Sequence, residues 1–166
     1  MTEQKDHAGG NAGVIAPPPL ISLAALLLGL ALDWLVPIGI LSTFLPLAAR
    51  LVVAALLAIV GIWLARTFFS TFSRLGTPVD PRQSVKALAT TGIFAKTRNP
   101  AYQAQGILLV ALAVAFASDW TFLLLPVWAL VMHYGVVARE ERYLEARFGE
   151  QYRNYKASVP RYGWPF

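Results

Sequence analysis

Cysteine is absent from this chain of 166 residues, which excludes disulfides, thiolate nucleophiles and cysteine-ligated zinc or iron–sulfur sites. Charge is scarce as well, because 14% of the residues are charged, whereas an ordinary soluble domain carries about 25%. A phosphate-binding glycine-rich loop, an HExxH zinc motif and a GxSxG motif are also missing. Apolar side chains make up 57% of the residues. These proportions argue against a water-soluble globule and indicate a small polytopic membrane protein.

The apolar residues form four long runs, each close to the roughly 20 residues that a helix needs to cross a bilayer. The runs cover residues 20–41, 47–69, 100–117 and 120–138. Only Ser118 and Asp119 separate the last two runs, so we expect an antiparallel hairpin in which one of these residues caps the second helix. The sequence therefore predicts an all-α integral membrane protein with about four transmembrane helices.

Basic residues are concentrated between the second and third runs and after the fourth. Residues 70–98 carry five basic side chains against Asp80, a net charge of +4, and residues 139–166 carry six against four acidic ones. The two short loops at the opposite ends of the runs contain neither lysine nor arginine. Because basic residues stay on the cytosolic side, both termini and the middle loop should be cytosolic.

One membrane domain is expected over residues 20–166, preceded by a disordered tail of residues 1–19 that is rich in glycine, alanine and proline. The domain divides into two N-terminal spans (20–69), a cytosolic loop (70–99), the helical hairpin (100–138) and a cytosolic cap (139–166). The sequence leaves the oligomeric state open.

The cap contains a helical pattern of apolar and aromatic residues. Leu144, Phe148, Tyr152 and Tyr155 recur at spacings of three and four, while charged residues mostly fill the other faces. This pattern predicts an amphipathic helix that lies against the membrane surface or the bundle and is broken near Gly149.

Polar residues gather at the cytosolic end of the third predicted helix. Asn99 and Pro100 suit the N-cap and the first helical position, and a helix N-terminus also offers free N–H groups to an anion. Arg98 beside them either reinforces anion binding or anchors the helix at the membrane surface.

One turn further into the third helix, Tyr102, Gln105 and Gly106 share a face. A polar face inside a membrane helix is costly unless it meets protein, water or a ligand, and Gly106 allows the close approach of a cofactor or of a neighbouring helix. At the opposite end of the first two helices, Asp33 and Arg50 are expected to pair with each other.

On the fourth helix, His133 and Glu140 are seven residues apart, which is two turns along one face, and Glu141 follows directly. An ionisable side chain two turns inside the boundary is a functional candidate, but a neutral histidine bonded to a neighbouring helix fits the same position. The glutamates also fit a solvated surface on which they pair with Arg139 and Arg142.

Two segments carry a resemblance to a known family. The first reads Thr91-Gly92-Ile93-Phe94, followed by Arg98-Asn99-Pro100 and Tyr102, and the second runs from Glu140-Glu141 through Phe148-Gly149 and Tyr152 to Val159-Pro160. Together, over approximately residues 88–166, they resemble the isoprenylcysteine carboxyl methyltransferase and phospholipid methyltransferase superfamily of small integral membrane enzymes. The chain departs from the pattern at Ile93, where proline is usual, and at Ser158, a position often basic in the prenylcysteine enzymes.

The resemblance implies that S-adenosylmethionine is held between the last two membrane helices and the cap. The residues implied to bind this cofactor are Gly92, Phe94, Arg98, Asn99, Pro100, Tyr102, Gln105, Gly106, His133, Glu140, Glu141 and Tyr152. The catalytic candidates are His133, Glu141 and Arg161, with His133 or one of the two glutamates as base. Lys156 and Arg161 lie close to Ser158 in the sequence, and either can replace the charge missing there.

The methyl acceptor implied by the same resemblance is a lipophilic molecule that arrives from the bilayer, such as a prenylcysteine carboxylate or a phospholipid amine. Neither a metal nor a nucleic acid is expected.

Two other classes of protein fit parts of the sequence. Membrane reductases resembling the steroid reductases, which use NADPH, also have an acidic pair, an aromatic–glycine step and a Val-Pro ending, but the segment from Arg98 to Tyr102 favours the methyltransferase. A small non-catalytic transporter would need a central membrane carboxylate, and Asp33 lies near a helix end.

Overall fold

The structure is a computed structural model that describes residues 12–76 and 87–163, and every regular element in these ranges is helical. The elements are α1 (Pro18–Leu35), α2 (Ile40–Phe44), α3 (Leu47–Leu75), η1 (Gly92–Ala95), α4 (Pro100–Phe116), α5 (Asp119–Met132), η2 (His133–Val137), α6 (Ala138–Phe148) and α7 (Glu150–Ser158). η1 is a 3₁₀-helix and η2 is a turn of π-helix.

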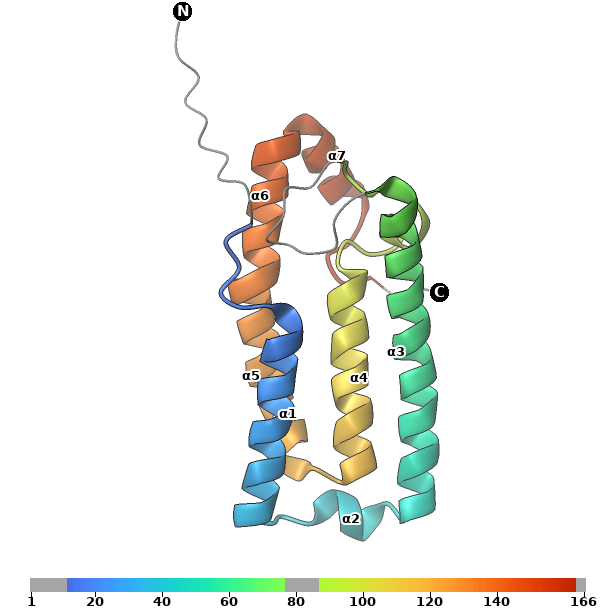
Figure 1. Cartoon of the computed structure of the whole chain (residues 1–166), viewed down its shortest axis with the longest axis vertical. Coiled ribbons are helices and arrows are strands. Elements are labelled where there is room, and N and C mark those ends of the chain that lie inside the picture. The colour runs from blue at the N-terminus through green and yellow to red at the C-terminus, as the bar shows by residue number, and fades with distance from the viewer. Residues whose placement is uncertain (1–11, 77–86, 164–166) are drawn as a thin grey trace, which may run out of the picture.

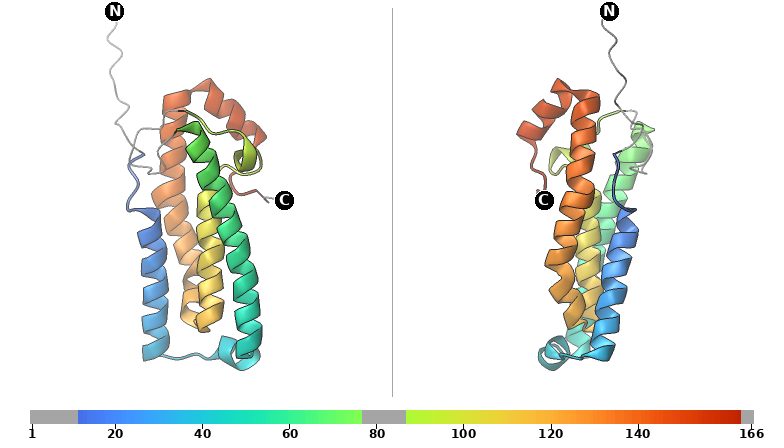
Figure 2. Two further views of the ribbon diagram at one scale, coloured as in Figure 1. Left: turned by 45° about the vertical axis from the view of Figure 1, so that its right-hand side comes forward. Right: turned by 90° about the vertical axis from the view of Figure 1, so that its left-hand side faces the viewer.

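Four long helices lie side by side, with α1 and α4 running in one direction and α3 and α5 in the other (Figure 1). α4 packs against α3, and α1 packs against both α5 and α4. The short α2 crosses one end of the bundle, and α6 with α7 forms a cap at the other end (Figure 2). The starts of α1 and α4 and the end of α3 therefore lie at the cap end, which is the end where the sequence places its basic segments.

Three helices are long and apolar enough to cross a membrane: Pro18–Leu35, Leu47–Arg74 and the continuous helix Asp119–Phe148. Large apolar side chains such as Leu27, Leu56 and Leu130 are more than half exposed on their outer faces, as expected of surfaces that contact lipid. The prediction of an all-α protein with membrane-spanning helices is confirmed. α4 is apolar but has 17 residues, so its assignment as a fourth span stays a prediction.

The first helix ends earlier than its apolar run. α1 stops at Leu35, and Val36 has the non-helical backbone angles φ −139° and ψ 75°, because a following proline disfavours the helical conformation. The remaining apolar residues form the separate α2 instead of a span that reaches Leu41. α3 extends beyond Phe69 and ends at Gly76, whose φ of +57° is favourable for glycine.

The predicted hairpin between α4 and α5 is present, and Ser118 caps its second helix by accepting a hydrogen bond from the Thr121 N–H at 3.1 Å. Asp119 acts elsewhere: its two carboxylate oxygens accept the backbone N–H groups of Ile40 and Leu41 at 2.8 and 2.9 Å. These bonds fix the start of α2 against the hairpin.

The expected pairing of Asp33 with Arg50 is wrong. The Asp33 carboxylate accepts hydrogen bonds from the Ser118 hydroxyl and from the Trp120 N–H, because the hairpin turn brings free donors within its reach. Nε of Arg50 is buried and has no hydrogen-bond partner among the described residues.

The described chain begins before α1 and packs on the bundle there. The Ile15 N–H donates to the Gly135 carbonyl at 3.1 Å, and Arg139 Nη1 donates to the Gly13 carbonyl at 2.9 Å. Residues 12–19 therefore differ from the disordered tail expected over residues 1–19, whereas residues 1–11 lie outside the described residues. The same is true of residues 77–86 of the predicted middle loop.

The last helix is continuous from α5 through η2 into α6, with no break between the predicted hairpin and cap. The predicted break near Gly149 is present, since this residue has a φ of +54° and separates α6 from α7. Tyr152 and Tyr155 of α7 pack into the core with Leu64 and Phe68 of α3, so the largest buried cluster lies at the cap end. The position of the cap relative to a membrane surface stays a prediction.

Candidate functional site

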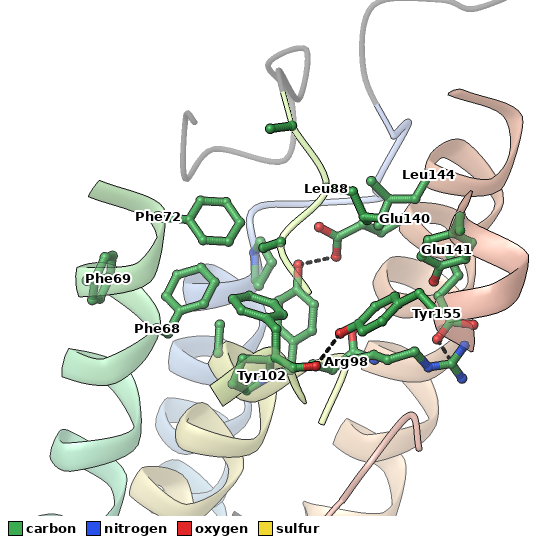
Figure 3. A pocket seen from close by; sticks show the side chains of 18 of the residues that line it. Phe68, Phe69, Phe72, Leu88, Arg98, Tyr102, Glu140, Glu141, Leu144 and Tyr155 are labelled. Carbon is green, nitrogen blue, oxygen red and sulfur yellow. Dashed lines mark hydrogen bonds and ion pairs between the residues drawn. The ribbon is translucent and has the colours of Figure 1, made fainter. Parts of the chain in front are cut away.

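A cavity of about 430 Å³ lies at the cap end, between the starts of α1 and α4, the end of α3, and α6 with α7 (Figure 3). Its size is typical of small-molecule sites, which range from about 300 to 1,000 Å³. We call it cavity A. It is lined by Pro17–Pro19, Phe68, Phe69, Phe72, Ala87–Ala89, Phe94, Arg98–Tyr102, Glu140, Glu141, Leu144, Tyr152 and Tyr155.

At the polar end of cavity A, the carboxylate of Glu141 binds two guanidinium groups. Arg161 donates to it twice, from Nε at 3.0 Å and from Nη2 at 2.7 Å, and Arg98 Nη2 lies 3.3 Å from Oε1. The side chains of Arg98 and Glu141 are only 8% and 7% exposed. Bidentate, charge-assisted bonds of this kind have a fixed geometry, so Glu141 determines where both guanidinium groups lie.

The guanidinium group of Arg98 is only partly paired with other side chains. Its Nε and Nη1 atoms are buried and have no hydrogen-bond partner among the described residues, although its backbone N–H donates to the Pro160 carbonyl at 3.0 Å. A buried donor without a partner is costly, and a guanidinium group beside a cavity suits a carboxylate or a phosphate. Arg98 thus places a buried cation in the wall of cavity A.

Glu140 has a different environment from Glu141. Its Oε2 accepts a hydrogen bond from the Tyr102 hydroxyl at 2.8 Å (Figure 3), and none of the ion pairs found among the described residues includes it. A carboxylate that lines a cavity without a cationic partner can bind a cationic group of a ligand. The two adjacent glutamates thus differ in their contacts: Glu141 pairs with two guanidinium groups, and Glu140 accepts a hydrogen bond from a phenol.

The opposite wall of cavity A is aromatic. The ring centroids of Phe68 and Phe72 are 4.6 Å apart, and that of Phe94 lies 5.9 Å from the first and 5.6 Å from the second. Such a cluster offers flat apolar surfaces on which a planar ring can stack. Cavity A thus combines one charged end with one aromatic wall.

The C-terminal segment is held in place by polar side chains around the start of α4. Thr97 Oγ1 and Asn99 Nδ2 each donate to the Arg161 carbonyl at 3.2 Å, and Gln103 Nε2 donates to the Gly163 carbonyl at 2.7 Å. Asn99 occupies the predicted N-cap position, but its side chain makes no capping bond. These bonds position the Arg161 side chain, and its hydrogen bonding to Glu141 raises the pKa of the guanidinium group further above its ordinary value.

Two tyrosines of α7 close the site from the cap. The Tyr155 hydroxyl donates to the Phe94 carbonyl at 2.7 Å, and Tyr152 is 1% exposed. Burial raises the pKa of both phenols, so both stay uncharged at neutral pH. They hold η1 and α7 together beside cavity A.

His133 does not share this site. It lines a second cavity of about 810 Å³, which we call cavity B and which also contains Tyr102, Gln103, Gly106 and Tyr162; its apolar walls are formed by Leu57, Ile107, Val110, Pro126, Trp128–Leu130, Met132 and Val137. Nδ1 of His133 lies 3.1 Å from the Tyr162 hydroxyl oxygen. The expectation that His133 and Glu140 share one face is wrong because η2 inserts a wider i→i+5 turn between them.

Three other predicted cofactor ligands also lie outside cavity A. Gln105 Oε1 accepts a hydrogen bond from Ser22 Oγ at 3.1 Å, which links α4 to α1. Gly106 packs against the ring of Trp128, where a Cβ would lie 3.0 Å away, so helix packing explains its small size. Gly92 starts η1 with a φ of +62°.

The predicted residues that the structure does bring together at cavity A are Phe94, Arg98, Asn99, Pro100, Tyr102, Glu140, Glu141 and Tyr152. Sequence reasoning missed the aromatic residues of α3, although Phe68 and Phe72 at a spacing of four could have been read as one helix face. It also missed Thr97 and Gln103, for which the sequence contains no comparable signal.

Long apolar helices around a cavity with one charged end suggest an integral membrane protein. A family model described as phospholipid methyltransferase matches residues 49–151, a range that runs from the first turn of α3 through α6 and includes both glutamates. The chain belongs to this family of methyltransferases, as the sequence resemblance predicted. It is also similar to an uncharacterized protein of Haemophilus influenzae, with 36% identity over 56 residues that cover 34% of this chain and 89% of that protein. No solved structure matches.

Proposed function

We propose that this protein is an integral membrane methyltransferase that uses S-adenosylmethionine to methylate a lipophilic acceptor. The observation that carries the proposal is the buried side chain of Arg98, which lines cavity A together with Glu140 and an aromatic wall. Neither alternative suggested by the sequence, an NADPH-dependent reductase or a transporter, agrees with the family match.

The residues of cavity A match the chemical groups of this cofactor one by one. Arg98 suits its carboxylate, Glu140 suits its ammonium group, and the cluster of Phe68, Phe72 and Phe94 suits its adenine ring. The ring of Tyr102 offers an electron-rich face to a sulfonium. When bound, the cofactor supplies an electrophilic methyl group on that sulfonium.

The chain's own contribution is positioning. Holding two reactants at near-attack distance is worth about 7–11 kcal/mol in the best intramolecular cases, and no further acid–base step is needed when the acceptor is already anionic. In this proposal Glu141 and Arg161 are positioning residues, because Glu141 pairs with Arg98 and Arg161 holds Glu141 through two hydrogen bonds. His133 lies on the side of cavity B and is the candidate base for an acceptor that carries a proton.

The membrane arrangement completes the proposal. We place the cap end in the cytosol because the basic segments lie there, and we assign α4 as the fourth span. A soluble, charged cofactor can then enter from the cytosol while the acceptor arrives through the bilayer. Both termini are cytosolic in this arrangement.

Calorimetric titration of the purified protein in detergent tests the cofactor. Arg98→Lys keeps the charge but removes the fork of donors, so S-adenosylhomocysteine should bind about ten- to a hundredfold more weakly. Methylthioadenosine, which lacks the amino-acid part, should bind unchanged. Glu140→Gln should also weaken the binding of S-adenosylhomocysteine. Glu150→Gln is the matched control, since Glu150 is exposed and pairs with Arg153 outside the cavity.

Activity is tested separately with S-adenosylmethionine labelled on its methyl group. Incubation with membrane extract should transfer the label to the organic-soluble fraction. A protein that binds NADPH in the same titration and neither S-adenosylmethionine nor its product would contradict the proposal.

A further inference from the structure

Cavity B differs from cavity A in charge. None of the described residues that line it is aspartate, glutamate, lysine or arginine, and most of its wall is aliphatic or aromatic. Its polar side chains are Tyr102, Gln103, His133 and Tyr162, and Trp128, whose indole N–H donates to Ser22 Oγ at 3.0 Å. A ligand that suits cavity B is therefore largely apolar, with few polar atoms.

Only one pair of these polar groups is available to a ligand. The Gln103 side chain is occupied on both sides, by the Thr97 hydroxyl and by the Gly163 carbonyl, and the Tyr102 hydroxyl donates to Glu140 in cavity A. There remain His133 and Tyr162, whose Nδ1 and Oη atoms lie 3.1 Å apart. When the phenol donates to Nδ1, the imidazole carries its hydrogen on the other nitrogen, so the pair offers one donor and one acceptor.

This pair suits an uncharged head group. A hydroxyl or a thiol can donate to the phenol oxygen or accept from the imidazole Nε2–H, and both partners stay neutral. A carboxylate or a phosphate would enter an apolar space without a counter-charge, which is strongly unfavourable. Arg161, the neighbour of Tyr162 in the sequence, gives its Nε and Nη2 donors to Glu141 and does not line the cavity.

The cavity also has a side entrance for such a ligand. Leu130 lines cavity B and is 58% exposed on the outer face of α5, within a helix that is long and apolar enough to span the membrane. A lipophilic molecule can therefore reach cavity B laterally.

We propose that cavity B binds an uncharged lipophilic molecule with a single hydroxyl or thiol head group, and that this molecule is the methyl acceptor. The second part rests on the proposed function. Tyr102 connects the two sites, because it lines both cavities and presents its hydroxyl to Glu140 on one side.

Trp128 lines cavity B and reports on its occupancy. The experiment measures quenching of tryptophan fluorescence in the full-length protein in detergent, using three probes of equal chain length with a terminal bromine: an alcohol, a carboxylate and an alkyl phosphate. The alcohol should quench saturably, and the two anions should bind at least about tenfold more weakly. Trp128→Phe should remove the saturable component. Trp120→Phe is the matched control, because Trp120 lies at the far end of α5 and bonds to Val36.

Two variants test the head-group contact. Tyr162→Phe should weaken the alcohol about three- to tenfold, the loss of one neutral hydrogen bond, and the exposed position of Tyr162 makes the substitution mild. His133→Arg should reverse the preference towards the carboxylate. Tighter binding of either anion to the wild type, or saturable quenching that survives in Trp128→Phe, would overturn the proposal.

Neither result depends on S-adenosylmethionine, so the two proposals fail separately. If the alcohol binds and the cofactor does not, the proposed ligand class of cavity B is supported and the proposed methyltransferase function is refuted. If the cofactor binds and the anionic probes are preferred, the methyltransferase function is supported and the proposed ligand class of cavity B is refuted.

Discussion

Replacing Glu141 with glutamine tests whether one buried carboxylate holds the cap on the bundle. Glu141 is 5% exposed and accepts two hydrogen bonds from Arg161, at 3.0 and 2.7 Å, while Arg98 Nη2 lies 3.3 Å away. Glutamine keeps the volume and one acceptor oxygen but removes the negative charge. The two guanidinium groups would then lie close together without a counter-charge.

The size of the effect follows from the burial of each partner. Removing one member of a buried ion pair costs about 3–5 kcal/mol, but the Arg161 side chain is 34% exposed, so solvent screens its share. The Arg98 side chain, at 8% exposed, dominates the loss, and we expect a value of about 3 kcal/mol, at the lower end of that range. For a chain of this size the corresponding fall in Tm is about 6–12 °C.

The assay is thermal unfolding of the purified variants in detergent, followed by far-ultraviolet circular dichroism. Glu150→Gln is the control, because its ion pair with Arg153 is exposed and should be worth less than about 1 kcal/mol. The double variant Arg98→Met with Glu141→Leu should be more stable than the Glu141→Gln protein, since it leaves no uncompensated charge on Arg98. Equal Tm values for the Glu141→Gln and Glu150→Gln proteins would refute this account of the cap.

Three further substitutions probe close contacts of the last long helix. Gly29→Leu should lower Tm strongly, because a Cβ on Gly29 would lie 2.1 Å from Thr121 Oγ1 and 2.7 Å from its Cα, and overpacking typically costs about 1–3 kcal/mol; an unchanged Tm would contradict the close crossing of α1 and α5. Gly135→Val should displace Ile15, because a Cβ on Gly135 would lie 2.4 Å from Ile15 Cδ1. Amide hydrogen exchange at Ile15, measured by mass spectrometry, should then become faster, and unchanged slow exchange would contradict the contact. Deleting Val136 should convert η2 to α-helix and turn α6 by about 100° relative to α5, which should abolish binding of S-adenosylhomocysteine, while Val136→Ala should retain it.

The membrane-spanning segments could be predicted because their signals are local. Pro100 starts α4 and Ser118 caps α5 as expected, since proline and serine at helix starts act through the backbone of their own turn. The end of α1 is also determined locally, by Pro37. It was not predicted because the apolar run continues past this proline. Length and hydropathy define an apolar run, but the backbone preference of the residue before proline decides where its helix stops.

Much of the candidate site depends on contacts that local pattern does not contain. Arg161 is positioned by Thr97, Asn99 and Gln103, which lie about 60 residues away in the sequence. Each of these polar residues near a helix start is common on its own, and only the fold shows that their donors converge on two carbonyl groups. The resemblance identified Arg98 and the two glutamates as site residues, but it did not predict which side chain each of them would contact.

The distinction between Glu140 and Glu141 illustrates what geometry adds to a motif. Adjacent residues on a helix point about 100° apart, so an acidic pair at the edge of a cavity cannot present both carboxylates to one ligand group. The structure turns Glu141 toward two arginines and Glu140 toward Tyr102. Glu141 thus pairs with two cations of the protein, whereas Glu140 accepts a hydrogen bond from Tyr102 in the wall of the cavity. The two adjacent glutamates of this chain therefore have different contacts, which the motif alone does not reveal.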